Sequence, residues 1–127
     1  MEPEKITINM GTVDLGKIDL LVDEGFYGNR TDFIRTAIRN QLSKHETELS
    51  QTIVRREMSL AALHYSASDL ERYVGDGHKL AIRSVGLLSI SHDVSPELAR
   101  QSIESITIFG VFRASKAVKE ALADRIR

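Results

Sequence analysis

Near its start the chain has a short stretch in which polar and apolar residues alternate strictly. Residues 5–10 alternate between polar and apolar side chains, a pattern that predicts a β-strand with two different faces. The apolar face of this strand carries Ile6, Ile8 and Met10. Two helical patterns and no second strand follow nearby, so the strand lacks a pairing partner close to it in the chain. A lone strand is unstable because its backbone edges stay unpaired.

A second copy of the chain supplies the missing partner most economically. Two copies of residues 5–10 pair antiparallel into a two-stranded ribbon, whose outer face displays Lys5, Thr7 and Asn9 from each copy. A two-stranded ribbon fits the major groove of DNA, and Lys, Thr and Asn are side chains that bind base edges there. The pattern therefore predicts base contacts by Lys5, Thr7 and Asn9. A solvated strand face with no ligand is the alternative.

Two helices are predicted after this strand. Apolar residues recur at helical spacing from Val13 to Glu24 and again from Arg30 to about His45. Gly25 is placed to end the first helix. Asn29 is placed to cap the second, and Asp32 lies three positions on, where a capping acid is favoured.

The middle of the chain is predicted to be helical. Residues 45–65 contain no Pro or Gly and are rich in helix formers, which predicts either an extension of the second helix or a separate one. Ser68 and Glu71 have the spacing of a capping box and open a short helix that runs to Val74. The Gly75–Gly77 segment ends that helix and is the best candidate for a domain boundary.

The last third reads as two strand-helix units. Residues 80–90 and 106–112 are predicted strands, each followed by a helix with a serine cap at Ser95 or Ser115. Gly86 and Gly110 occupy equivalent places in the two units, 24 residues apart. This order implies a parallel pair of strands, and two such units are too few to bury a core without a counterpart in another copy.

The first part of the chain resembles a known family. Strand, helix, glycine turn and asparagine-capped helix are the pattern of the ribbon-helix-helix DNA-binding proteins, the MetJ/Arc and CopG-like superfamily. The resemblance covers about residues 4–46 and is strongest over Ile18–Arg39. It departs from the family at Met10–Thr12, where a Pro or a capping polar residue usually opens the first helix, and at Gly16 inside that helix. The resemblance implies a homodimeric, or higher, bacterial regulator of transcription, most often a repressor, that binds double-stranded DNA.

The resemblance also implies roles for particular residues. The ribbon positions that contact bases correspond to Lys5, Thr7 and Asn9. The start of the second helix, which holds a DNA phosphate, corresponds to Asn29, Arg30 and Thr31. The intertwined dimer core corresponds to Ile6, Ile8, Ile18, Val22, Phe33, Ile34 and Ile38.

Together these elements predict an α+β chain in three parts. Residues 1–46 form the ribbon-helix-helix domain, residues 47–75 a helical connector, and residues 76–127 a strand-helix-strand-helix region. The last region is expected to serve oligomerisation or to bind a protein or small-molecule partner.

Composition narrows the function further. The chain has no Cys, and His45, His64, His78 and His92 show no metal-ligand spacing, so neither a metal nor a cofactor is expected. No signal-peptide pattern and no apolar run near the roughly 20 residues of a membrane span appear, so a cytoplasmic protein is expected. Residues 1–46 hold six Lys or Arg and eight Asp or Glu, an acidic balance that is unusual for a DNA-binding domain.

Two other functions stay open beside DNA binding. The chain could be an antitoxin-like module that masks a partner protein, although residues 76–127 look folded rather than like a charged tail. It could also use the ribbon for dimerisation alone, which the acidic balance supports. No motif for catalysis is present, so an enzyme is not expected.

Overall fold

The computed structural model describes residues 3–127 and divides the chain into two compact units, residues 1–52 and 53–127. Met1 and Glu2, which the sequence assigns to the first domain, lie outside the described residues. Residues 1–52 are called the N-terminal unit and residues 53–127 the C-terminal unit, and each is described by itself.

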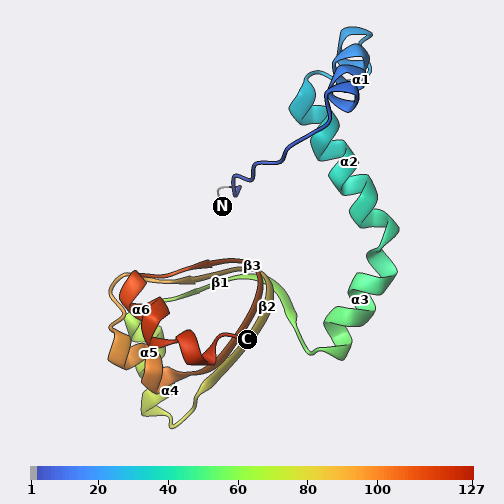
Figure 1. The fold of residues 1–127 in the computed structure, drawn as a ribbon. Coiled ribbons are helices and arrows are strands. Elements are labelled where there is room, and N and C mark those ends of the chain that lie inside the picture. The colour runs from blue at the N-terminus through green and yellow to red at the C-terminus, as the bar shows by residue number, and fades with distance from the viewer. Residues whose placement is uncertain (1–2) are drawn as a thin grey trace. The chain divides into compact units, whose positions relative to one another are not determined.

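The N-terminal unit begins with an extended segment and two helices whose ends lie within one residue of the predicted ones. Helix α1 spans Thr12–Asp23 and helix α2 spans Arg30–Lys44 (Figure 1). Gly25 has φ +86° and donates its amide to the carbonyl of Val22, which closes the end of α1 as predicted. The start of α1 follows Gly11, which offers no side chain for capping.

A separate helix, α3 (Glu46–Arg55), follows α2 after a break at His45. The sequence left open whether this helix extends α2, and the structure separates the two. The prediction that the helix continues to residue 65 is wrong. Glu57 adopts φ +53° and ends the helical path, and Ser59–Tyr65 forms strand β1.

The wrong prediction for β1 has a physical cause. Leu60 and Leu63 lie three residues apart, a step that fits the apolar stripe of a helix rather than one face of a strand. The strand is stabilised by parallel pairing with β2, which starts 21 residues after β1 begins, and a local pattern contains no information about that partner. The predicted helical connector over residues 47–75 is therefore interrupted by a strand.

The cap of helix α4 (Ala67–Gly75) lies two residues before the predicted one. Ser66, not Ser68, is the cap: its hydroxyl accepts from the amide of Asp69, and the Asp69 carboxylate accepts from the amide of Ser66 at 2.9 Å. Because β1 ends at Tyr65, Ser66 is the first residue free to cap. The Gly75–Gly77 segment is a turn inside the C-terminal unit, with Gly77 at φ +73°, rather than a boundary between units.

The C-terminal unit is a three-stranded parallel sheet in the order β1-β2-β3. Strands β2 (Leu80–Ile90) and β3 (Ile103–Arg113) confirm the predicted strands, and their parallel pairing is confirmed as well. Helices α5 (Pro96–Ser102) and α6 (Lys116–Ala121) follow them with the predicted serine caps. In Figure 1 the helices α4, α5 and α6 lie along one side of the curved sheet.

The predicted repeat is a structural one and has three units, not two. Gly86 pairs with Gly110 across β2 and β3, as their equivalence predicts, and Ala61 of β1 pairs with Gly86 on the other side. The strand-helix-strand-helix prediction is thus corrected to three strand-helix units, the first being β1 and α4. Three units bury a core of their own, made of Leu70, Ile82, Leu88, Ile90, Val94, Ala99, Ile103, Ile106, Val118 and Leu122.

Strands β1 and β3 form the two edges of the sheet, and the edge of β3 is paired at one point with the last residues of the chain. Near the end of the chain, Ile126 forms a parallel bridge to Ile106 of β3, and the amide of Arg127 donates to the Ile106 carbonyl at 2.8 Å. The α+β class is therefore confirmed, with a parallel sheet in the second unit. None of the helices in the described part of the chain is long and apolar enough to cross a membrane.

Candidate nucleic-acid interface

The predicted ribbon strand is an extended N-terminal segment in the single chain. Residues 3–11 form neither helix nor strand, and Lys5, Thr7 and Asn9 are all exposed. Ile6 and Ile8, between them, expose 75% and 62% of their surface. The predicted strand is therefore not formed within the single chain, and its pairing with a second copy stays a prediction.

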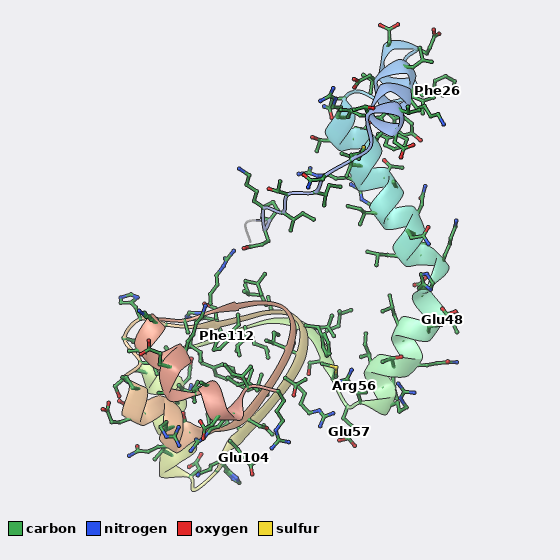
Figure 2. All side chains as sticks on the ribbon, in the orientation of Figure 1. Phe26, Glu48, Arg56, Glu57, Glu104 and Phe112 are labelled. Carbon is green, nitrogen blue, oxygen red and sulfur yellow. The ribbon has the colours of Figure 1, made fainter. Side chains whose placement is uncertain are left out.

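The corner between α1 and α2 is built from short, local contacts. The amide of Phe26 donates to the carbonyl of Leu21 at 3.0 Å, which reverses the chain after α1. Tyr27 and Phe33 meet edge to face with ring centroids 5.0 Å apart, which fixes α2 against this turn. Phe26 points outward from the corner and is 70% exposed (Figure 2).

The first turn of α2 is an ordered helix N-terminus. The side-chain oxygen of Asn29 accepts from the amide of Asp32 at 2.8 Å, and a carboxylate oxygen of Asp32 accepts from the amide of Gly28 at 3.0 Å. The predicted cap at Asn29 is thus confirmed. A helix start leaves its first amides without partners inside the helix, and here those are the amides of Arg30 and Thr31. They lie at the positive end of the helix dipole, where an anion binds favourably.

The side chain of Arg30 has a partner that the sequence did not predict. Its guanidinium binds the Asp19 carboxylate of α1 through two hydrogen bonds, 2.7 and 2.8 Å long. These hydrogen bonds lower the pKa of Asp19 and raise the pKa of Arg30. Both side chains are about half exposed, so the pair is a surface one that a competing anion can reach.

The residues predicted for the dimer core are mostly not buried in the single chain. Ile18 is buried, whereas Val22, Phe33 and Ile34 are partly exposed and Ile38 is 46% exposed. A hollow of about 420 Å³ opens beside them. Its lining is formed by Met10, Asp14, Lys17, Ile18, Leu21 and Phe33.

Sequence reasoning missed Asp19 as a residue of this site. It lies eleven positions before Arg30, on the other helix, so no helical spacing connects the two. Only the fold of the corner brings them together. Arg30 therefore lies at the start of α2, as predicted, but its guanidinium is bound by the Asp19 carboxylate.

A polar hollow of about 420 Å³ lies in the C-terminal unit, almost entirely outside residues 76–127, to which the sequence analysis assigns partner binding. Its lining comes from the end of β1 and from α4: His64, Tyr65, Asp69, Arg72, Tyr73 and Asp76. Burial raises the pKa of Tyr65 in this lining. No cluster of three or more His, Asp or Glu side chains able to hold a metal occurs among residues 3–127.

Comparison with known proteins identifies a family. The family model described as "Ribbon-Helix-Helix transcriptional regulator family" matches residues 1–119. The match continues well beyond residues 4–46 and spans both units. Neither the curated proteins nor the solved structures give a significant match.

Proposed function

The chain belongs to the ribbon-helix-helix transcriptional regulator family, and from this premise we propose that it is a homodimeric repressor that reads a specific DNA sequence. Two copies of residues 5–10 form the antiparallel ribbon, which enters the major groove. Membership of the family implies a DNA-binding role in the regulation of transcription, and sequence-specific reading by a ribbon and repression go beyond it.

One observation carries the proposal: the N-terminal unit leaves nearly all of its apolar residues exposed or only partly buried. Among residues 3–52, only Ile18 is buried. Ile6 and Ile8 lie open on the segment before α1, and Ile38 is open on α2. A second copy that brings the same surfaces pairs the segments edge to edge and covers the helices, which satisfies both the backbone and the apolar side chains.

The reading of bases follows from the alternation in the segment. When Ile6 and Ile8 face the dimer core, Lys5, Thr7 and Asn9 face outward. The ammonium of Lys5 donates to guanine acceptors, and the amide of Asn9 both donates to and accepts from adenine. Three side chains from each copy give six contacts in the groove.

Phosphate anchoring belongs to the start of α2. The amides of Arg30 and Thr31 point along the helix axis toward an anion, while the Asn29 side chain keeps the first turn in shape. The Arg30 guanidinium adds to this site when a phosphate replaces the Asp19 carboxylate. In this exchange a DNA phosphate takes the place of the Asp19 carboxylate on an exposed guanidinium.

The test is a binding titration on the cognate site, which is first found by selection from random DNA. Lys5→Ala and Asn9→Ala are expected to weaken binding by about 1–3 kcal/mol each, roughly 5- to 150-fold, because each removes a base contact. Lys116→Ala is the control for charge, since Lys116 is an exposed lysine on α6, and Asn40→Ala is the control for the amide. If neither ribbon variant differs from its control, the ribbon does not read DNA.

An antitoxin-like module remains the second candidate. The folded C-terminal unit with its own buried core argues for a stable domain rather than a tail that folds on a partner. A partner protein that co-purifies in equal amounts with the chain favours the second candidate. A dimer that binds no DNA favours a third candidate function, in which the ribbon serves only to join two copies of the chain.

A further inference from the structure

The sheet of the C-terminal unit has a second face that its helices do not cover. The register aligns six apolar side chains on it in two rows, with one residue from each strand in a row. We call this set the outer apolar face. It consists of Leu60, Val85 and Phe109 in one row and of Ala62, Leu87 and Val111 in the next.

The opposite face of the sheet carries the core. Ile82, Leu88 and Ile106 alternate along the strands with the residues of the outer apolar face, and they pack with Leu70 of α4 and Val118 of α6. All three helices lie on this side (Figure 1). Phe112 also points to this side from β3, under Lys119 of α6 (Figure 2).

Parallel sheets are found almost only with both faces covered. Here Leu60 exposes 74% of its surface and Phe109 exposes 49%, although Arg56 stacks over the Phe109 ring at 4.9 Å. Antiparallel sheets tolerate one wet face because their outward residues are polar, whereas the central positions of this face are Leu, Val, Phe and Ala. The outer apolar face therefore needs a cover.

A second copy of the same face fits this need. Six side chains offer on the order of a few hundred Å², less than the roughly 800 Å² per partner of a stable free-standing interface. The face is thus too small to hold two separate molecules together. It is large enough for two C-terminal units that the N-terminal dimer already holds at an effective concentration near the millimolar range.

The way the units are joined supports this occupant. The C-terminal unit begins at Ile53, within α3, so no long flexible linker separates it from the N-terminal unit. A dimer of the N-terminal units therefore keeps two C-terminal units, each with an identical face, tethered to each other. An apolar face paired with its own copy is the isologous arrangement of a two-fold dimer.

We propose that the outer apolar faces of the two copies in a dimer pack against each other and close the C-terminal units into a second interface. This inference rests on the N-terminal dimer of the proposed function. The two sheets lie face to face, with β2 of one copy across β2 of the other, so Val85 and Leu87 lie nearest the two-fold axis.

Single cysteines test the arrangement cleanly because the natural chain has none. Leu87→Cys and Val85→Cys place a thiol on the central strand, and Val74→Cys places one on α4, where Val74 is 37% exposed on the helical side. Under mild oxidation, at least one of the two β2 variants is expected to form disulfide-linked dimers at least tenfold faster than Val74→Cys. Equal rates, or no linked dimer from either β2 variant, overturn the proposal.

A second measurement guards against misfolded variants. Leu60→Ser alters a side chain that is three-quarters exposed in the single chain, so the unit itself is not perturbed. It is expected to raise the dissociation constant of the dimer about tenfold, whereas Val74→Ser leaves it unchanged. An unchanged constant for Leu60→Ser contradicts the proposal.

The outcomes separate this inference from the proposed function. A protein that sediments as a monomer removes the basis of both. A dimer that binds DNA through Lys5 and Asn9, yet shows no cross-link at Val85 or Leu87, leaves the proposed function intact and overturns the second interface alone.

Discussion

Two glycines in the C-terminal unit lie side by side in the sheet and are required by its backbone. Gly86 has φ +135° and Gly110 has φ +127°, in the left-handed half of the map that other residues rarely adopt. A Cβ atom on Gly86 would overlap the carbonyl oxygen of Ala61, and one on Gly110 would overlap the carbonyl oxygen of Gly86. Strands β2 and β3 approach their neighbours this closely only because no side chain stands between them.

Gly110→Ala is therefore expected to destabilise the protein by about 2–3 kcal/mol or more, since it combines a strained φ with a clash against backbone. Gly16→Ala is the matched control: Gly16 lies within α1, where an added methyl group would have no atom within 4 Å, so this variant should gain about 0.5–1 kcal/mol of stability. Urea unfolding followed by circular dichroism measures both. A Gly110→Ala protein as stable as the natural one would show that the close approach is not real.

Some residue-level features were predictable from sequence and others were not. The Asn29 cap followed from side-chain chemistry and spacing, because capping is local. The pairing of Gly86 with Gly110 followed from their equivalent places in the repeat. The Arg30–Asp19 pair did not follow, since two helices must first fold against each other. The base contacts of Lys5, Thr7 and Asn9 stay predictions.

At the scale of elements, α4 is held at its start by a reciprocal pair of hydrogen bonds. The amide of Ser66 donates to the Asp69 carboxylate, and this contact is the main reason that the pKa of Asp69 is lowered from its usual value of 3.8. The Ser66 hydroxyl and the Arg72 guanidinium lower it further. Folding thus favours the ionised form of Asp69.

This cap makes part of the stability depend on pH. A group with a lowered pKa in the folded state stabilises fully above its unfolded pKa, and the contribution is lost as the pH falls through the folded pKa. The contribution of Asp69 is therefore present at neutral pH and fades below about pH 4. In Asp69→Asn the difference in unfolding midpoint between neutral and acidic pH should shrink. Unfolding midpoints of both proteins at the two pH values check this, and an unchanged difference in Asp69→Asn would contradict it.

Among the strands, β2 and β3 could be predicted from the sequence and β1 could not. Strands β2 and β3 were predictable because runs of Ile, Val and Leu lie between clear helix caps. Strand β1 was not, because Ala61, Ala62 and Leu63 suit a helix as well and the choice is made by pairing with β2. The serine cap moved from Ser68 to Ser66 for the same reason, since the end of β1 decides where α4 can start.

For the whole molecule, the two units differ in how they are stabilised. The C-terminal unit has a core of ten buried apolar residues, whereas the described part of the N-terminal unit has one, Ile18. Strand β3 pairs with β2 and bridges Ile126, so within the described chain residues 5–10 are not paired with it. The N-terminal unit should therefore fold only when two copies meet.

Dilution tests this dependence. For a dimer, each tenfold dilution costs about 1.4 kcal/mol of stability. Hydrogen exchange should show that amides of α1 and α2 lose protection as the protein is diluted through its dissociation constant, while those in the centre of β2 keep theirs because their partners lie in the same chain. Protection of α1 and α2 that does not change with concentration would mean that the N-terminal unit is stable alone.

The parallel register has a consequence for how such a chain can change in length. Each strand-helix unit of about 24 residues offers its successor the same hydrogen-bonding edge and the same glycine-sized gap. An insertion or deletion of one whole unit keeps every remaining edge matched, whereas a shift of one residue within a strand turns core side chains toward solvent. The number of units can thus change by duplication or loss of a whole unit, whereas a one-residue change within a strand disrupts the packing of the core.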